Sequence, residues 1–346
     1  MKRLTAYLTG LSQIEVREDE IREPNEGEIL VQIKAIGICG SDISYYQKGT
    51  GGIGYVKYPH IPGHECAGVV YQVGKGIEEW KPGDRIAIEP GVPCGKCTYC
   101  LGGRYNLCKR LSFMSTAVVR EYGEGGMASF VIRPDKMLYS LPDSMSFEQG
   151  AMLEPISVAL HAFHQSGLRS GQSAAILGCG PIAGCIMQVL KASGIDDIYM
   201  TDVIESRTKV MKRLGAKDAY DTSRYQQEET ENLLPQEVDC VFDTTCSDKA
   251  INTSVKWLKK GGTIVLVGVP HGYYNLDMNA VFNKEARIHT SFRYVNTYDD
   301  AIAMISSGRL KPEELITHRC PLRDAVRAME LASSRDPSVL KIILNP

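Results

Sequence analysis

The chain has 346 residues, of which 43% are hydrophobic and 23% are charged, the balance of a soluble globular protein with roughly two domains. Its formal net charge of -2 gives no electrostatic reason to expect a nucleic acid or an anionic membrane as a partner. The amino-terminal segment has no continuous apolar core, so we expect no signal peptide and a cytoplasmic protein.

Strand and turn signals dominate residues 1–150. Short apolar or alternating runs are broken by Gly, Pro and Asp at residues 28–38, 65–74 and 84–91. Helical signals are scarce before the segment near Glu148–Gln165. These patterns predict a β-rich first domain.

Four cysteines fall within fifteen residues of this domain, with the spacing C-x2-C-x2-C-x7-C. They are Cys94, Cys97, Cys100 and Cys108. Four thiolates can close a tetrahedral shell around Zn²⁺, and a closed shell has no open position for a substrate. The spacing therefore predicts a structural zinc site, and any catalysis must occur elsewhere.

From about residue 171 the pattern changes to an alternation of strands and helices. Apolar strands are expected at 173–178, 197–202, 238–243 and 262–268, and helices at 182–193, 206–214 and 249–259. This alternation predicts βαβ units with a parallel sheet. The run from Ser173 to Leu190 is nearly long enough to span a membrane, but its glycines and proline favour a strand, a turn and a helix. Residues after about 290 are expected to rejoin the first domain, ending in a strand at 341–344.

A dinucleotide-binding turn is predicted at Gly178-Cys179-Gly180-Pro181-Ile182-Ala183, a G-x-G-x-x-A variant between a strand and a helix. Gly178 permits the tight turn, and Gly180 lets the backbone approach the pyrophosphate. The helix that begins at Pro181 and Ile182 presents free N–H groups to the phosphates.

Asp202 ends the second strand at about the distance expected for an acid that binds the ribose hydroxyls. Its carboxylate would repel a 2′-phosphate, which favours NAD over NADP. Arg207 lies close by in the sequence, and a basic residue there could tolerate a phosphate.

A second candidate metal site combines Cys39, His64, Glu65 and Glu154. Separately, each has an ordinary interpretation as a buried thiol, a core histidine or a surface acid. Glu154 is unusual because it lies within an apolar run, and a buried carboxylate needs a partner or a metal. One thiolate, one imidazole and one carboxylate would neutralise Zn²⁺ and leave a fourth position open, the pattern of a catalytic zinc.

Together with the cysteine lobe, seven further motifs resemble those of the zinc-dependent medium-chain dehydrogenases, especially the sorbitol (polyol) dehydrogenase branch. The motifs are GICGSD, PGHECAGVV, KPGDRIAIEPG, GRYNLC, LEPISVALHA, GCGPIAG and FRYVNT. The resemblance covers essentially the whole chain. It implies an α/β protein with a GroES-like catalytic domain at residues 1–150 and 290–346 that holds both zinc ions. A Rossmann domain at residues 151–289 would bind NAD, with the active site in the cleft between the domains.

The resemblance also assigns residues to the catalytic zinc. Cys39 and His64 match two zinc ligands, and Glu65 matches the carboxylate ligand of sorbitol dehydrogenases. Glu154 matches an acid that binds zinc directly in some relatives and through water in others, so either glutamate is a candidate for the third ligand. Alcohol dehydrogenases of the family have a cysteine near Glu154, and this difference favours a polyol substrate.

Further roles follow from the same resemblance. Ser41 is expected to pass the substrate proton outward, although Ser44 replaces a histidine that many relatives have further along the relay. Four residues are expected to contact the polyol: Tyr45, Glu154, Arg293 and Tyr294. Three are expected at the nicotinamide pocket: Val267, Phe292 and Arg293.

The predicted activity is the NAD-dependent oxidation of a secondary hydroxyl of a sugar alcohol such as sorbitol, xylitol or iditol to a ketose. Zinc would lower the pKa of the hydroxyl, and a hydride would pass to the nicotinamide. A sugar-alcohol phosphate, threonine or butanediol is an alternative substrate, and relatives suggest a homodimer or homotetramer. The alternative outside the enzymes is a zinc-lobe module that binds a protein or nucleic acid. An iron–sulfur cluster is disfavoured because its usual cysteine spacing is not reproduced.

Overall fold

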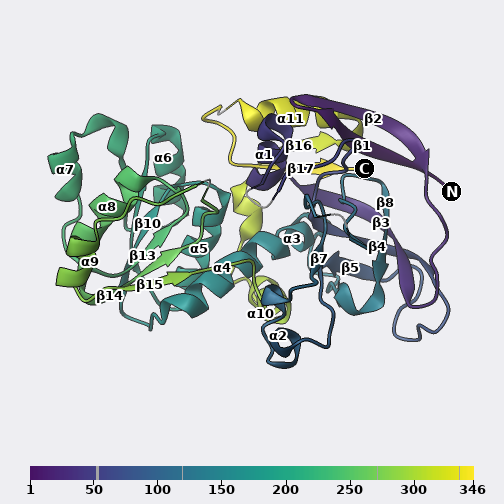
Figure 1. Ribbon diagram of the computed structural model, residues 1–346, viewed down its shortest axis with the longest axis horizontal. Helices are drawn as coiled ribbons and strands as arrows, with labels where there is room; N and C mark the ends of the chain where they lie inside the picture. Colours follow the sequence, from purple (N-terminus) through teal and green to yellow (C-terminus); the bar gives the residue numbers. More distant parts are fainter. Residues whose placement is uncertain (52–53, 119, 271, 335) are drawn as a thin grey trace. The chain divides into compact units, whose positions relative to one another are not determined.

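The computed structural model describes residues 1–51, 54–118, 120–270, 272–334 and 336–346. The chain forms two compact units (Figure 1). The first comprises Met1–Glu154, Tyr298–Gly308 and Ile316–Pro346, and the second comprises Pro155–Thr297 and Arg309–Leu315. These bounds lie a few residues beyond those predicted, and the return of residues 309–315 to the second unit was not predicted.

The first unit is built on a largely antiparallel sheet with strand order β16-β17-β3-β4-β5-β9, in which β8 also pairs with β3. Its strands are β3 (Glu28–Gly37), β4 (Glu65–Val73), β5 (Arg85–Ile88), β8 (Phe130–Pro134), β9 (Leu138–Ser140), β16 (Ile316–Pro321) and β17 (Lys341–Asn345). Two smaller sheets pair β1 (Lys2–Gly10) with β2 (Gln13–Glu20), and β6 (Gly91–Val92) with β7 (Ser112–Phe113). The carboxyl-terminal strands, yellow in Figure 1, thus complete the sheet that β3 begins.

Helices of the first unit are short. They are α1 (Gly40–Lys48), α2 (Thr98–Leu101), α3 (Phe147–Ala151), α10 (Tyr298–Ser306) and α11 (Ala325–Ser333). The long strands β3 and β4 form the centre, and their contact is close because Gly68 has no side chain. A Cβ atom there would lie 2.1 Å from the backbone oxygen of Gln32.

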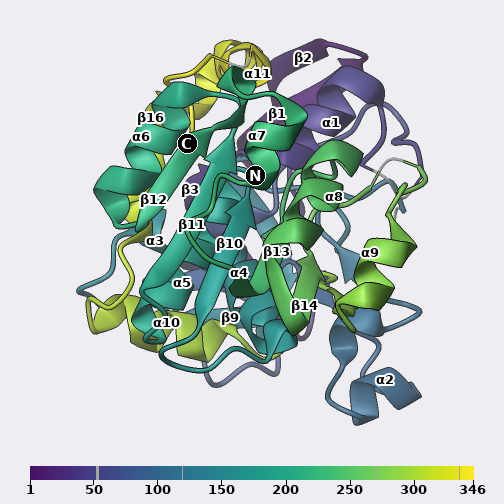
Figure 2. The ribbon, with the colours of Figure 1, turned by 90° about the vertical axis from the view of Figure 1, so that its left-hand side faces the viewer.

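The second unit is a six-stranded parallel sheet with the order β12-β11-β10-β13-β14-β15. Its strands are β10 (Ser173–Leu177), β11 (Asp197–Asp202), β12 (Asp218–Asp221), β13 (Val238–Asp243), β14 (Leu258–Leu266) and β15 (Arg287–Thr290). Its helices are α4 (Leu153–Ser166, which begins in the first unit), α5 (Pro181–Ala192), α6 (Glu205–Leu214), α7 (Gln227–Glu231), α8 (Asp248–Trp257) and α9 (Met278–Asn283). Figure 2 shows α5 and α6 on one side of this sheet and α8 and α9 on the other.

The predicted alternation of strands and helices is confirmed, with most bounds within one or two residues; β14 begins four residues before its predicted start. The segment from Ser173 to Leu190 folds as β10, a turn and α5, as expected. In the part of the chain that the structure describes, no helix has both the length and the apolarity needed to cross a membrane. The short strands β12 and β15 and the β1–β2 hairpin were not predicted.

A buried carboxylate fixes the start of β3. Glu28 accepts hydrogen bonds from the Arg22 guanidinium (2.5 and 2.8 Å), the Asn25 N–H (2.7 Å) and the Tyr122 hydroxyl (3.0 Å). The bond from Arg22 is the largest cause that lowers the pKa of Glu28 from 4.5 to about 2. A carboxyl whose pKa is lower in the folded state stabilises the fold above its unfolded pKa, and this contribution disappears as the pH falls toward the folded pKa.

Replacement of Glu28 by Gln should therefore lower the free energy of unfolding by about 1–3 kcal/mol at pH 7, because the donors lose their charged acceptor and one acceptor oxygen becomes an NH2 group. The difference from the unmutated chain should shrink between pH 4.5 and about 2, where Glu28 itself becomes protonated. Urea denaturation across this pH range measures both effects. The exposed Glu26→Gln is the matched control, and an equal loss in that variant would contradict the assignment.

Candidate active site and metal centres

Three potential metal ligands meet where β3 ends and β4 begins. Cys39 follows β3 and caps α1, whereas His64 and Glu65 lie at the start of β4. Antiparallel pairing places Gly37 opposite Glu65, and one ligand atom each from Cys39, His64 and Glu65 lie within 4.8 Å of one another. A Cβ atom on Gly37 would lie 1.8 Å from Glu65 Oε2, so only glycine leaves space for this carboxylate.

Asp42, which the sequence analysis did not single out, joins the two ligand-bearing segments. Its fully buried carboxylate accepts hydrogen bonds from the N–H of Cys39 (3.0 Å) and the N–H of Gly63 (2.9 Å). Its Oδ1 also lies 3.9 Å from His64 Nδ1. Asp42 is the third residue of α1, and a capping box was the local signal that could have revealed it.

Lys341 on β17 was also missed as a site residue. Its side chain is 2% exposed, forms an ion pair with Glu65 and donates a hydrogen bond to the Ile38 carbonyl oxygen at 3.0 Å. A buried ammonium requires such partners. Lys341 is separated from Glu65 by most of the chain, so only the folded sheet reveals their contact.

Glu154 lies at the start of α4 and is 5% exposed. Burial is the main cause that raises its pKa to about 8, and the charges of His64, Glu65 and Cys39 also act on it. Burial likewise raises the pKa of the Cys39 thiol to about 11. Of the two candidate glutamates, Glu65 belongs to the group whose ligand atoms lie within 4.8 Å of one another, and Glu154 does not.

The donor set fits a divalent cation. Three buried carboxyl groups, Asp42, Glu65 and Glu154, lie close to the Cys39 thiol. Lys341 and His64 are among the groups whose charges offset them. Thiol, imidazole and carboxylate are the ligand types that zinc prefers. Zinc would favour the thiolate that burial otherwise disfavours.

The remaining predicted residues of the first unit have distinct surroundings. The Ser41 hydroxyl is hydrogen-bonded to the Cys39 thiol, whereas the Ser44 hydroxyl donates to the Thr50 carbonyl oxygen at 2.6 Å. Tyr45 is 4% exposed in the hydrophobic core and packs edge-on against His60, with ring centres 5.5 Å apart. The contact of Tyr45 with a polyol therefore stays a prediction.

The four-cysteine lobe has the geometry of a closed metal shell. Ligand atoms of Cys94, Cys97, Cys100 and Cys108 lie within 4.8 Å of one another. The N–H groups of Cys94 and Arg110 each donate to Cys108 Sγ at 3.4 Å. A backbone hydrogen bond at Lys96 is the largest cause that lowers the pKa of Cys94 to about 5. Four converging sulfurs with such donors suit a structural zinc ion.

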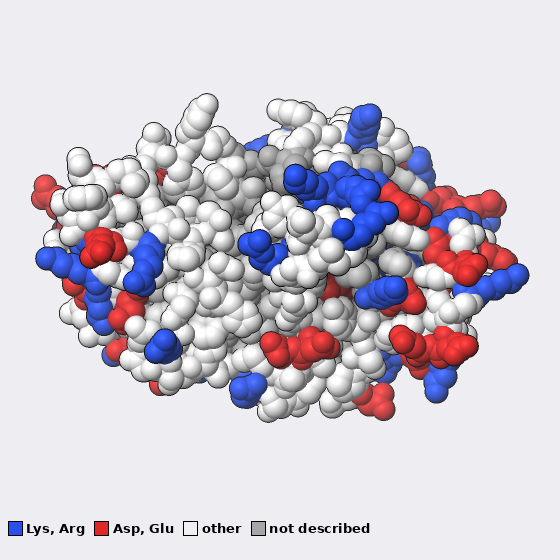
Figure 3. All heavy atoms as spheres, turned by 60° about the horizontal axis from the view of Figure 1, so that its bottom comes forward, with Lys and Arg blue, Asp and Glu red and all other residues white. Residues whose placement is uncertain are grey.

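Basic side chains on the lobe are partly engaged within it. The Arg104 guanidinium lies 5.8 Å from the centre of the Tyr99 ring, and Arg110 is hydrogen-bonded to Cys94. On the face of the molecule in Figure 3, basic and acidic side chains occur near one another, so one sign of charge does not cover it. These features give no specific support to the alternative of a nucleic-acid-binding lobe.

In the second unit, the glycine-rich turn has the expected form. Gly178 has a φ of 96°, and a Cβ atom there would lie 2.6 Å from Thr244 Oγ1. Gly180 caps α5, and Pro181 and Ile182 form its first turn, so free backbone N–H groups are available to phosphates. Asp202 ends β11, where its carboxylate accepts hydrogen bonds from the N–H of Cys179 (2.7 Å) and of Ile204 (3.0 Å).

A cavity of about 210 Å³ lies beside this turn, at the carboxyl ends of the parallel strands. This is the edge at which open α/β sheets bind ligands. The sequence analysis did not identify its lining, which includes Leu177, Thr201, Val203, Tyr225, Ser247 and Lys249. Arg207 follows Asp202 closely in the sequence, lies on α6 and is partly buried.

The other predicted residues of the second unit follow β14 and β15. The Val267 N–H donates to the Asp243 carbonyl oxygen at 2.9 Å, and Val267 is 8% exposed. Arg293 has a φ of 55° and its guanidinium lies 4.9 Å from the centre of the Phe292 ring. Tyr294 is 3% exposed. Their contacts with substrate or cofactor stay predictions.

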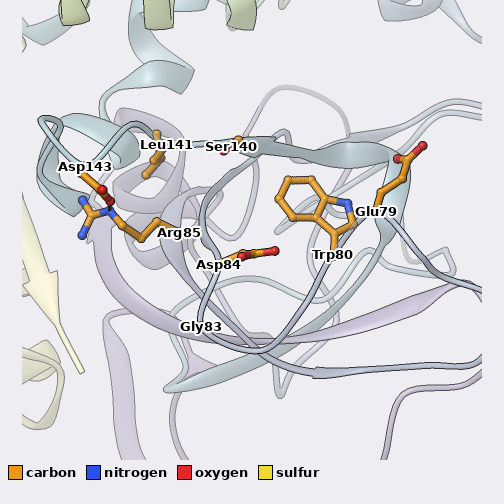
Figure 4. Close-up of a pocket in the computed structure, with 8 residues that line it drawn as sticks. All are labelled: Glu79, Trp80, Gly83, Asp84, Arg85, Ser140, Leu141 and Asp143. Atoms are coloured by element: carbon orange, nitrogen blue, oxygen red, sulfur yellow. Dashed lines mark ion pairs between the residues drawn. The ribbon is translucent and has the colours of Figure 1, made fainter.

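A separate cavity of about 370 Å³ in the first unit includes none of the predicted site residues (Figure 4). It lies at the turn between β4 and β5, where the Trp80 indole and Asp84 face the hollow and Arg85 lies near Asp143. The residues that line it are separate from the grouped metal ligands and from the glycine-rich turn.

Two family models match most of the chain. Residues 25–143 match the alcohol dehydrogenase GroES-like domain, and residues 181–307 match the zinc-binding dehydrogenase domain. The sorbitol dehydrogenase of Bacillus subtilis is 32% identical over 99% of this chain and 96% of that protein. The chain belongs to the zinc-dependent medium-chain dehydrogenases and is sorbitol dehydrogenase-like. D-Xylulose reductase A of Aspergillus niger is 33% identical over 95% of this chain and 93% of that protein.

Solved structures agree with this membership. An alcohol dehydrogenase of Escherichia coli CFT073 in complex with NADH has a TM-score of 0.91 and 27% identity, covering 100% of this chain and 99% of that one. A zinc-binding dehydrogenase from Sinorhizobium meliloti bound to NADP has a TM-score of 0.89 and 26% identity, covering 100% of both chains. The chain is thus an oxidoreductase with a GroES-like and a Rossmann-type unit, and zinc and a nicotinamide dinucleotide are its cofactors.

The two ligand groups predict different consequences of zinc loss. Cys97→Ser and Cys39→Ser should each remove one zinc ion per chain, because each breaks one of the two groups. The lobe variant should show the larger fall in melting temperature, since a structural zinc contributes directly to folding. Elemental analysis and calorimetry measure both quantities. Unchanged zinc content in either variant would refute the corresponding site.

Proposed function

We propose that this dehydrogenase oxidises a secondary hydroxyl of a polyol of the sorbitol, xylitol or iditol type to a ketose, with NAD as the hydride acceptor. The observation that carries the proposal is the group of half-buried Cys39 with buried His64 and Glu65, which offers three ligands of the types used by catalytic zinc. Zinc bound there supplies a Lewis acid that lowers the pKa of a substrate hydroxyl.

Ser41 is the residue that we assign to proton removal. Its hydroxyl neighbours Cys39 and can accept a proton while donating one onward. Ser44 donates its own hydrogen to Thr50, so we assign the relay only as far as Ser41.

Glu154 supports a substrate with several hydroxyl groups. It places a buried carboxyl group near the ligand group, and such a group can accept or donate hydrogen bonds according to its protonation. The names of similar proteins, sorbitol dehydrogenase and D-xylulose reductase, favour the same substrate class. Arg293 and Tyr294 are proposed as further polyol contacts, and Val267 and Phe292 as neighbours of the nicotinamide.

The substrate class can be tested by NADH formation with pentitols, hexitols, their phosphates, 2,3-butanediol and threonine. We expect the highest kcat/KM with an unphosphorylated pentitol or hexitol, because several hydroxyls can bond to the buried acid and to Arg293. Cys39→Ser should abolish this turnover and still bind NADH. A clear preference for butanediol, threonine or a phosphate would refute the polyol assignment, and turnover by Cys39→Ser would refute the zinc mechanism.

Asp202 supports NAD over NADP, because a carboxylate at the end of β11 would repel a 2′-phosphate. Replacement of Asp202 by Ala should reduce the preference for NAD by at least about tenfold, a change of about 1.4 kcal/mol. Ratios of kcat/KM for the two cofactors measure it, with Arg207→Ala as the control for the nearby basic residue. Equal use of NAD and NADP by the unmutated chain would contradict the role of Asp202.

A further inference from the structure

A buried aspartate outside the predicted residues connects three segments of the second unit. Asp243 ends β13 and is 0% exposed. One oxygen of its carboxylate accepts hydrogen bonds from the Thr245 N–H (2.8 Å) and the Thr245 hydroxyl (2.7 Å). Its other oxygen accepts one from the Tyr274 hydroxyl. Its backbone oxygen accepts the N–H groups of Val267 (2.9 Å) and Gly268 (3.1 Å).

The turn that follows Asp243 lies against the glycine-rich turn. Thr244 donates through both its N–H (3.1 Å) and its hydroxyl (2.7 Å) to the Leu177 carbonyl oxygen. A Cβ atom on Gly178 would lie 2.6 Å from Thr244 Oγ1 and 3.2 Å from Thr245 Cγ2. The position of residues 244–246 therefore determines the space around the first glycine of the fingerprint.

Residues 272–277, which carry Tyr274, are also fastened to the start of α8. Asn275 donates through its N–H to Asp248 Oδ1 at 3.2 Å and through its side chain to Asp248 Oδ2 at 2.5 Å. Asn252 donates to the Asn275 carbonyl oxygen at 2.7 Å and accepts from the Asp277 N–H at 2.7 Å. The same end of α8 supplies residues that line the 210 Å³ cavity beside the glycine-rich turn.

We propose that Tyr274 is a positioning residue for the dinucleotide, because its hydrogen bond to Asp243 holds residues 272–277 and the turn 244–246 in the arrangement that shapes the cofactor site. The inference rests on the proposed function in that it concerns binding of NAD at this turn. Tyr274 acts through Asp243, and its role is to hold the site ready before the cofactor arrives. Pre-organisation of this kind increases affinity because less order has to be gained on binding.

Burial and the Asp243 carboxylate raise the pKa of Tyr274 well above its ordinary value, so the hydroxyl remains a donor at neutral pH. Tyr274 is partly buried and packs against the core of the second unit, whereas the adjacent Tyr273 is 99% exposed. The chain thus offers two neighbouring tyrosines, of which one forms the bond to Asp243 and the other is available as a matched control.

The test compares Tyr274→Phe with Tyr273→Phe by titration with NADH in the absence of substrate. We expect Tyr274→Phe to raise the Kd about tenfold, equivalent to about 1.4 kcal/mol. Tyr273→Phe should stay within about twofold of the unmutated chain. In turnover, Tyr274→Phe should raise the KM for NAD and leave the KM for the polyol and the zinc content unchanged, a pattern that general destabilisation would not produce.

Asp243→Asn completes a double-mutant cycle. If the two side chains act as a unit, the double variant should bind NADH no more weakly than the weaker single variant. An NADH affinity of folded Tyr274→Phe equal to that of Tyr273→Phe, or fully additive effects in the cycle, would overturn the proposal.

Hydrogen exchange of the unmutated protein keeps the inference testable if the variants do not fold. Addition of NADH should increase amide protection in residues 244–246 and 272–277 together with the glycine-rich turn. Protection of the glycine-rich turn alone would overturn the inference. Because the NADH titrations and the hydrogen exchange use no substrate, a failure of polyol oxidation would contradict the proposed substrate and leave this inference intact.

Discussion

The ion pair of Lys341 and Glu65 is the interaction on which the first unit's site depends. Both side chains are 2% exposed, and an unpaired charge at that depth costs several kcal/mol. The pair requires β17 to lie beside β3, and it requires glycine at position 37 so that the carboxylate has space. The carboxyl-terminal strand is therefore part of the site's construction, although none of the predicted ligands lies on it.

The two ligand groups differ in their ligand types, since one offers four thiols and the other a thiol, an imidazole and a carboxylate. In the lobe, a backbone hydrogen bond at Lys96 is the largest cause that lowers the pKa of Cys94 to about 5, whereas desolvation is the largest cause that raises the pKa of Cys100 to about 12. At the strand ends, burial raises the pKa of Cys39 to about 11 and that of Glu154 to about 8. Zinc bound at the second group would stabilise the Cys39 thiolate, which burial otherwise disfavours. A strongly polarising ion is also what Lewis-acid catalysis requires.

The sequence predicted those features whose signal is local. The cysteine spacing, the G-x-G-x-x-A turn and the alternation of apolar strands and helices each depend on neighbouring residues, and each appears in the structure. Lys341 was missed because its partner Glu65 is distant in the sequence. Asp42 and Asp243 also make local hydrogen bonds, but their links to Gly63 and to Tyr274 appear only in the folded chain. The sequence also left two glutamates as candidates for the third ligand, and only the pairing of Gly37 with Glu65 places the latter within 4.8 Å of the other ligand atoms.

Asp202 supports the fold, and in the proposed function it also sets the choice of cofactor. Its two oxygens accept the N–H groups of Cys179 and Ile204, so it holds the glycine-rich turn in place without a cofactor. A carboxylate has about four lone-pair positions, and two backbone donors leave capacity for two ribose hydroxyls. Ribose binding therefore need not break the bonds that shape the turn. A 2′-phosphate, in contrast, would bring negative charge to a carboxylate that the backbone bonds prevent from moving away, so the proposed preference for NAD would follow from this rigidity.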